Sequence, residues 1–227
     1  MNWEDVLIVG DSFCGNRTDK NHWPQYLTSK VTGITFDPTR MPRGQGYPGA
    51  SWWSVRKRLI KELAIHIPKV LIICHTEPLR IPNDKDWGVN FRSVELGQIH
   101  VLNSTDKPMP ENFRLGASLY YQEIMSLNFH EWANLAWFKE LDEIAKPIEK
   151  VLHLYCFEGQ YTDYTFSKGT TLTVPLITYQ REAPIFRKAA FAPNHFTLQD
   201  NIIFAESLAR LVDNYPGDNI RIDAKII

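Results

Sequence analysis

The chain has 227 residues, which is long enough for one large domain with a sizeable core. Its 25 Lys and Arg residues stand against 26 Asp and Glu residues, and this balance argues against a general binder of nucleic acid or membrane surfaces. No apolar run approaches the ~18 residues needed to span a bilayer, and the N-terminal stretch MNWEDVLIVG is acidic where a secretory signal is basic, so we expect a soluble, cytoplasmic protein.

The first third of the chain alternates strand patterns with one clear helix. Residues 6–9 (VLIV) have the unbroken apolar pattern of a buried strand, and residues 33–36 (GITF) are predicted to form a second strand. After Ser51, apolar side chains recur at helical spacing, and Ser51 itself is well placed to cap that helix before Pro68 ends the segment. Residues 70–74 (VLIIC) predict a third strand.

The remainder of the chain continues this alternation around one irregular stretch. The irregular pattern of residues 80–128 predicts that they form a partly ordered insertion. We expect a single domain that covers residues 1–227. Residues 130–145 predict a helix, residues 151–157 (VLHLYCF) predict a fourth strand, and an irregular region rich in Thr and Tyr follows. The spacing of Thr197 and Asp200 is that of a capping box, so a last helix is expected just after His195. The pattern predicts a three-layer α/β/α, flavodoxin-like fold with a mostly parallel sheet and helices on both faces.

Polar residues follow the predicted strands, where an open parallel sheet binds its ligands. They are Ser12 after the first strand, the glycine loop 46–49 after the second, His75, Thr76 and Glu77 after the third, Glu158 after the fourth, and Asn194 and His195 before the last helix. A serine hydroxyl becomes a good nucleophile when a base such as histidine removes its proton. Backbone N–H groups in a glycine turn or at a helix start can stabilise an oxyanion. Together these residues point to acyl transfer.

Three short motifs resemble the blocks of the SGNH (GDSL-type) hydrolases, in the same order along the chain. Residues 10–12 (GDS) resemble the first block, residues 46–51 (GYPGAS) the second, and residues 194–196 (NHF) the last. The resemblance covers the whole chain in the order and spacing of its elements, although only these three motifs carry it.

The resemblance implies a role for each matching residue. Ser12 would be the nucleophile, His195 the base, and the backbone amides of Ser12 and Gly49 would donate to the oxyanion. The implied reaction is hydrolysis of an ester through an acyl-enzyme, with small-molecule esters or O-acetyl groups on carbohydrate as the substrate class. No cofactor is required.

Two positions depart from the family pattern. The third block of the family is usually Gly-x-Asn-Asp, and its asparagine completes the oxyanion hole, whereas residues 74–78 read CHTEP and leave Thr76 or His75 as the substitute donor. The residue three before His195 is Ala192, where the family has an aspartate that orients the base. The sequence leaves Asn194, Glu158 or Asp163 to orient His195, and Asp11, His75 and Glu77 to line the site.

These departures favour an alternative function. A protein of this fold could bind rather than catalyse, as in divergent SGNH-like proteins of bacteriophages, with residues 80–128 as the surface for a protein partner and a virion as the location. A third hypothesis is a phosphate or nucleotide binder that uses the loop after the first strand, which the single Gly10 and the bulky Phe13 disfavour.

The three cysteines indicate neither a disulfide framework nor a metal centre. Cys14, Cys74 and Cys156 are odd in number and widely separated, without metal-ligand spacing. The histidines outside the candidate site show no ligand spacing either, so no metal site is predicted. We expect the three cysteines to be reduced thiols buried for structural reasons.

Overall fold

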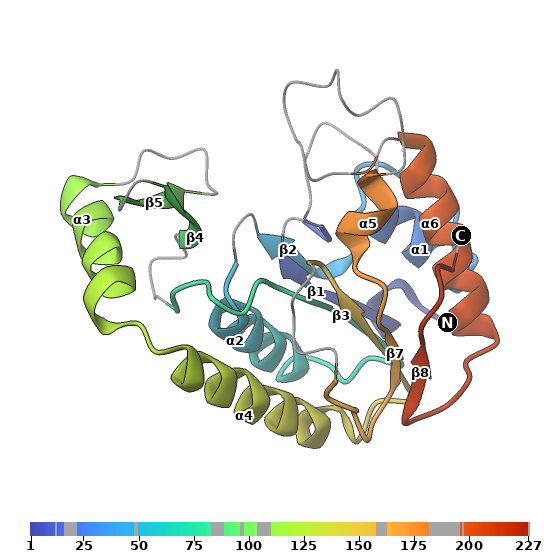
Figure 1. The fold of residues 1–227 in the computed structure, drawn as a ribbon. Coiled ribbons are helices and arrows are strands. Elements are labelled where there is room, and N and C mark those ends of the chain that lie inside the picture. The colour runs from blue at the N-terminus through green and yellow to red at the C-terminus, as the bar shows by residue number, and fades with distance from the viewer. Residues whose placement is uncertain are drawn as a thin grey trace.

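The structure is a computed structural model. It describes residues 1–11, 13–15, 22–47, 50–82, 89–95, 98–103, 110–157, 163–181, 196 and 198–226. These residues form one six-stranded sheet with helices packed on it and a separate two-stranded hairpin (Figure 1). No helix within these ranges combines the length and the apolar character needed to cross a membrane.

The main sheet is parallel throughout. Its strands, in their order across the sheet, are β2 (Arg43–Tyr47), β1 (Val6–Asp11), β3 (Val70–His75), β6 (Lys150–Tyr155), β7 (Thr170–Leu172) and β8 (Ile220–Ile222). Each neighbouring pair is parallel. The predicted α/β class is therefore confirmed, and the arrangement is that of a three-layer, flavodoxin-like fold.

Helices cover both faces of the sheet because successive strand residues point to opposite sides. On one face, Val6 and Ile8 pack with α1 (Trp23–Thr32) and α6 (Leu198–Asp213). On the other face, Leu7 and Val9 pack with α2 (Trp52–Leu63) and α4 (Leu127–Ala145). Strands buried on both faces read as unbroken apolar runs, which is why β1, β3 and β6 were recognisable in the sequence.

The second strand is not the one predicted. Residues 33–36 form no strand, because Gly33 ends α1 in the left-handed conformation (φ 71°) and the Phe36 ring stacks on Tyr26 at 4.3 Å between centroids. The strand is β2, whose sequence RGQGY has little apolar character because it lies at the sheet edge. The prediction at residues 33–36 was wrong because a short apolar run after a helix resembles a buried strand.

The predicted helices are present, with small differences at their ends. Ser51 caps α2, since its Oγ accepts a hydrogen bond from the Ser54 N–H at 3.4 Å. Helix α4 begins earlier than predicted because Ser126 caps it by accepting from the Phe129 N–H at 3.2 Å. The last helix, α6, follows His195 as expected.

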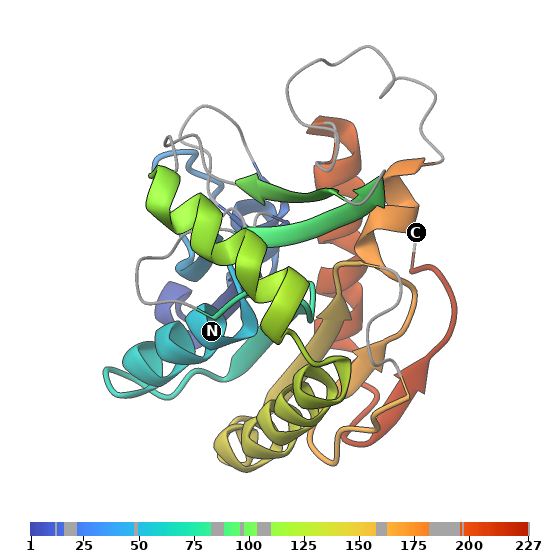
Figure 2. The same ribbon diagram turned by 60° about the vertical axis from the view of Figure 1, so that its left-hand side comes forward.

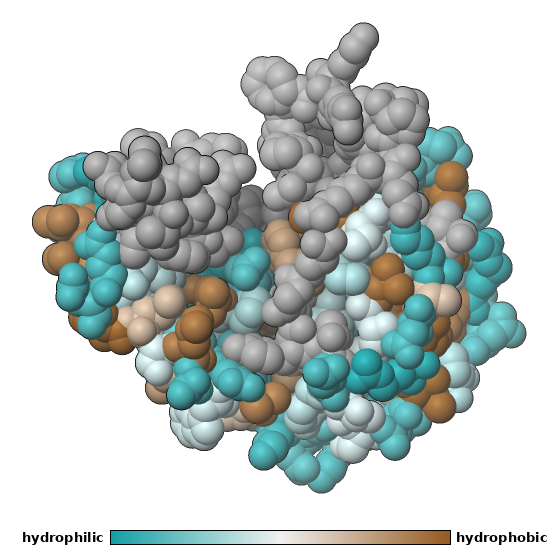
Figure 3. Space-filling view, viewed as in Figure 1, coloured by the Kyte–Doolittle hydropathy of each residue, from teal (hydrophilic) through white to brown (hydrophobic). Residues whose placement is uncertain are grey.

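The chain between β3 and β6 adds elements that lie apart from the main sheet. They are the antiparallel pair β4 (Val89–Glu95) and β5 (Gln98–Asn103), helix α3 (Glu111–Leu119) and the π-helical turn η2 (Tyr120–Ile124). Figure 2 shows α3 lying beside this hairpin. The chain from α3 to the start of α4 exposes six large apolar side chains, which we call the α3–α4 apolar surface: Leu115, Leu119, Ile124, Leu127, Phe129 and Trp132. Part of this surface is visible on the outer side of α3 (Figure 3).

The region after β6 contains more regular structure than predicted. Strand β7, helix α5 (Leu176–Arg181) and the short strand β8 after α6 were missed, as was the 3-10 turn η1 (Trp3–Asp5). Elements of three to six residues leave too few positions for a periodic pattern to be visible in a sequence.

Candidate active site

The carboxyl ends of the central strands meet at one edge of the sheet. Asp11 at the end of β1 lies opposite Tyr47 of β2, and Val9 lies opposite Ile73 of β3. The strand order changes direction at β1, so β1 and β3 flank the topological switch point at which open α/β sheets bind ligands. The candidate site therefore lies where the chain leaves β1 at Asp11 and β3 at His75.

Several residues predicted for this site lie outside the described residues. They are Ser12, Gly49, Glu158, Asn194 and His195. The structure describes the chain neighbours Asp11, Phe13, Ala50, Phe157 and Phe196, and the predicted site residues His75, Thr76 and Glu77. Asp163, a candidate for orienting His195, is exposed. The described part of the site thus consists of the neighbours of the predicted residues and the segment that follows β3.

The Asp11 carboxylate is fully buried and is held by four contacts. Its Oδ1 accepts from the Phe13 N–H at 3.0 Å and lies 3.5 Å from Cys156 Sγ. Its Oδ2 accepts from Arg80 Nη1 at 3.0 Å and lies 3.4 Å from Thr76 Oγ1. Both oxygens are thus engaged in fixing the turn that follows β1.

Arg80, which the sequence did not single out, joins the segments that follow four strands. Its Nη1 shares two protons among three acceptors: Asp11 Oδ2 at the end of β1, the Ala50 carbonyl oxygen after β2 at 2.9 Å, and Thr76 Oγ1 after β3 at 2.5 Å. Its guanidinium lies 5.0 Å from the ring centroid of Phe157, after β6. The side chain is buried, and Nε has no hydrogen-bond partner among the described residues.

Thr76 uses its hydroxyl proton within this cluster. Thr76 Oγ1 lies 2.6 Å from the Ala50 carbonyl oxygen, which can only accept, while the same oxygen accepts from Arg80. A hydroxyl has one proton, so Thr76 donates to an oxyanion only after releasing Ala50. Its predicted role as an oxyanion donor stays a prediction, in competition with this bond.

The Glu77 carboxyl is largely buried after β3. Burial raises its pKa, while the positive charge of Arg80 lowers it and the negative charge of Asp11 raises it again. Within the described part of the chain, no hydrogen bond or ion pair holds the carboxylate. Glu77 therefore gains a proton at a higher pH than an ordinary glutamate does.

His75 forms a buried pair with His153. His153 Nε2 lies 2.9 Å from the Lys168 carbonyl oxygen, so we infer that Nε2 carries the proton and that Nδ1 accepts from His75 Nε2 at 3.2 Å. The Phe166 ring stacks on His153 at 3.6 Å between centroids. Burial lowers the pKa of His75 well below its ordinary value, with help from His153, and lowers the pKa of His153 to about 4. Both rings are thus neutral at pH 7.

The histidine pair predicts a loss of stability in mild acid. An unfolded histidine has a pKa of about 6.5, so between pH 6.5 and 4 the unfolded chain binds more protons, and the folded state loses about 3 kcal/mol from His153 alone as the pH falls. Urea titrations at pH 7 and pH 4.5 measure this difference. His153→Gln is expected to be less stable at pH 7 and to show a smaller dependence on pH, and an unchanged dependence would contradict the assignment.

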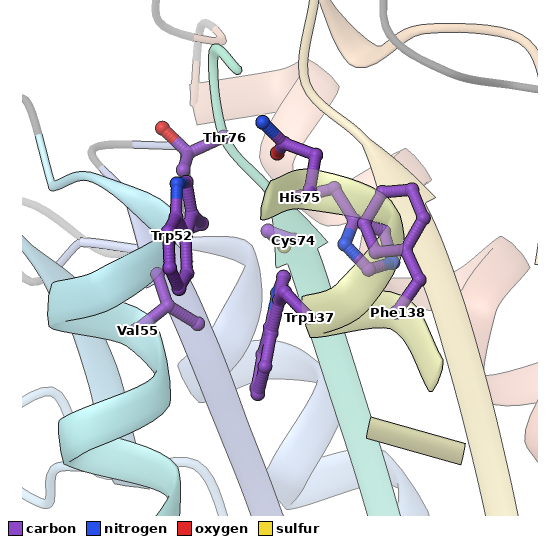
Figure 4. A pocket seen from close by; sticks show the side chains of 8 residues that line it. Trp52, Val55, Cys74, His75, Thr76, Trp137 and Phe138 are labelled. Carbon is purple, nitrogen blue, oxygen red and sulfur yellow. The ribbon is translucent and has the colours of Figure 1, made fainter. Parts of the chain in front are cut away.

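A small pocket opens beside this pair, between α2 and α4. Its lining residues are Trp52, Val55, Cys74, His75, Thr76, Asn134, Trp137 and Phe138. Figure 4 shows the Trp52 and Trp137 indoles on either side of it, with Thr76 and His75 at the end of β3. It is open to solvent and holds little more than one water-sized group, and the Trp52 Nε1–H has no hydrogen-bond partner among the described residues. The pocket suits a small, partly apolar group.

The three thiols gather beneath the candidate site. Cys14, Cys74 and Cys156 are free and buried, as predicted, and the Cys74 thiol contacts the other two. Burial raises the pKa of Cys74 well above its ordinary value and that of Cys156 to about 12. In the described ranges, no group of three or more His, Cys, Asp or Glu residues could hold a metal ion. The three side chains form part of the buried apolar cluster on one face of the sheet.

A chain of hydrogen bonds links the neighbours of the two predicted catalytic residues. Phe13 follows Ser12, and its carbonyl accepts from Trp23 Nε1 at 2.6 Å. The Trp23 N–H donates to Asn201 Oδ1 at 2.9 Å, and Asn201 Nδ2 donates to the carbonyl of Phe196 at 3.2 Å. Phe196 follows His195 and packs against the same apolar cluster that contains Phe13. The start of α1 and the start of α6 thus connect these two segments.

Comparison with known proteins identifies no relative. No protein-family model, curated protein or solved structure matches the chain.

Proposed function

We propose that this chain is a serine hydrolase that cleaves an ester, with Ser12 as the nucleophile and His195 as the general base. The observation that carries the proposal is the hydrogen-bonded link between Phe13 and Phe196. It supports the proposal because the ends of the link are the chain neighbours of the two proposed catalytic residues. The switch point of the sheet, directly at the end of β1, supports the same location.

The proposed mechanism proceeds through an acyl-enzyme. His195 takes the proton from Ser12 Oγ as that oxygen attacks the ester carbonyl. The backbone amides of Ser12 and Gly49 hold the oxyanion of the tetrahedral intermediate. The ester C–O bond then breaks, and the leaving alkoxide takes the proton from His195. Water, activated by His195, hydrolyses the acyl-enzyme and restores Ser12.

The pocket beside Thr76 supports a short acyl group. Trp52 and Trp137 limit its width, and Thr76 at its rim contacts Asp11, the residue before Ser12. Among common acyl groups, acetyl is one that so narrow a pocket would admit with little movement of the two indoles. O-acetyl groups on carbohydrate are therefore the proposed substrates, with small acetate esters as convenient probes.

The test is the hydrolysis of p-nitrophenyl acetate by the wild type and by Ser12→Ala. We expect the wild type to turn over and the variant to lose at least about 10³-fold in rate, because the nucleophile is absent. The exposed Ser167 provides the matched control, and Ser167→Ala is expected to keep the wild-type rate. Equal rates for the wild type and Ser12→Ala, together with no labelling by a serine-reactive phosphonate, would contradict the proposal.

A second candidate function is binding of a protein partner without catalysis. The observation that favours it is the α3–α4 apolar surface, which exposes Phe129 by 55% and Trp132 by 66%. A group of exposed apolar side chains of this kind often marks an interaction surface. This candidate predicts that Phe129→Ser with Trp132→Ser abolishes binding of a partner, while Ser12→Ala leaves it unchanged.

A further inference from the structure

We propose that Arg80 is a positioning residue that sets the spacing of the two proposed backbone donors of the oxyanion hole. This inference rests on the proposed function. Arg80 acts through Asp11 and Ala50, which are the chain neighbours of Ser12 and Gly49.

The geometry at Nη1 carries the inference. This one nitrogen lies 3.0 Å from Asp11 Oδ2 and 2.9 Å from the Ala50 carbonyl oxygen. It therefore ties the segment that ends with Ser12 to the segment that begins at Gly49. Thr76 Oγ1, at 2.5 Å from Nη1 and 2.6 Å from the same carbonyl, completes the cluster. A fixed distance between donors matters because an oxyanion hole works through preorganised N–H groups.

The Arg80 side chain makes more contacts than it would need merely to neutralise the charge of Asp11. The Arg80 side chain is 5% exposed and the Asp11 side chain is fully buried, so the ion pair is shielded from water. Arg80 Cζ also lies over the Phe157 ring, 5.0 Å from its centroid, so the side chain has a second contact besides its ion pair. Nε stays buried without a partner in the described part of the chain, and native proteins leave few such groups unless function requires them. The contacts of Nη1 thus determine how the guanidinium group is oriented, and this orientation leaves Nε–H without a hydrogen bond among the described residues.

The test compares Arg80→Lys and Arg80→Met with the wild type. Lysine keeps the charge beside Asp11 but is a flexible point charge without the planar fork, whereas methionine keeps the length and removes the charge. For a folded Arg80→Lys we expect kcat for p-nitrophenyl acetate to fall by about 10- to 100-fold while KM changes by less than about threefold, because the oxyanion forms only in the reaction. Arg80→Met is expected to lose more activity and also to unfold at a lower temperature.

Circular dichroism and thermal unfolding show which variants fold. Arg56, which pairs with Glu140 between α2 and α4, provides the control, and Arg56→Lys is expected to keep the wild-type kcat. A folded Arg80→Lys with kcat within about twofold of the wild type would overturn the inference while leaving the proposed function intact. Activity that falls only in proportion to the folded fraction would also overturn it, since a purely structural role predicts that result. A wild type without Ser12-dependent turnover would overturn the proposed function and this inference together.

Discussion

Replacing Asp11 with alanine is expected to lower the free energy of unfolding by about 3–5 kcal/mol, because it leaves the Arg80 guanidinium charged and buried without its partner. The substitution also removes the acceptor of the Phe13 N–H. Urea unfolding followed by far-UV circular dichroism at pH 7 measures the change. The double variant Asp11→Ala with Arg80→Met is expected to be more stable than Asp11→Ala alone, since the uncompensated charge is gone.

An exposed ion pair of the same length provides the control. Lys30 and Glu206 also lie 3.0 Å apart, but their side chains are 54% and 41% exposed. Glu206→Ala is expected to change the free energy of unfolding by less than about 1 kcal/mol, because water screens the pair. If Asp11→Ala lowers the free energy of unfolding no more than Glu206→Ala does, burial does not strengthen the ion pair between Asp11 and Arg80. The proposed stabilising role of Asp11 would then be wrong.

Replacing Gly46 with alanine is expected to lower the free energy of unfolding by about 3 kcal/mol or more, at the upper end of what overpacking costs. A Cβ at this position would lie 1.8 Å from the Asp11 carbonyl oxygen and 2.8 Å from Cys14 Sγ. The first of these atoms is backbone, so β2 has to move away from β1. That movement disturbs the end of β1 at Asp11, and if the proposed function is correct we expect the rate of p-nitrophenyl acetate hydrolysis to fall together with the stability.

The matched control is Gly116, an exposed glycine in the interior of α3. No heavy atom lies within 4 Å of a Cβ added there. Gly116→Ala is expected to stabilise the chain by about 0.5–1 kcal/mol, because alanine loses less backbone entropy in a helix. Thermal unfolding of the two variants side by side separates the steric effect at Gly46 from a general effect of the substitution. A Gly46→Ala variant as stable as the wild type would show that the two strands tolerate separation.

The sequence was most informative where burial produces a long, regular pattern. The mainly apolar sequences of β1 (Val6–Asp11), β3 (Val70–His75) and β6 (Lys150–Tyr155) and the helical spacing after Ser51 were recognised correctly. Strand β2 was missed because it forms by pairing with β1, with two glycines in five residues and no apolar run. Edge strands and three-residue strands depend on their neighbours, and a local pattern does not encode those neighbours.

The same limit applies to the candidate site. The sequence placed Asp11, His75 and Thr76 at the carboxyl edge because each follows a recognisable strand. The contacts of Arg80 with Asp11 and of His75 with His153 join residues 69 and 78 positions apart. The sequence around Arg80 and His153 contains no pattern that identifies them as partners of Asp11 and His75. Arg80 is four residues after Thr76, however, and could have been considered for that reason.

The gathering of Cys14, Cys74 and Cys156 gives this protein a built-in reporter of local opening. The three sulfurs come from the segments after β1, at the end of β3 and after β6, and all are shielded from water. A thiol reagent can reach them only when those strand ends separate, so labelling rates measure the opening of this edge directly. Because the three sulfurs lie at the carboxyl ends of three different strands, the order in which they are labelled gives the order in which these strand ends come apart.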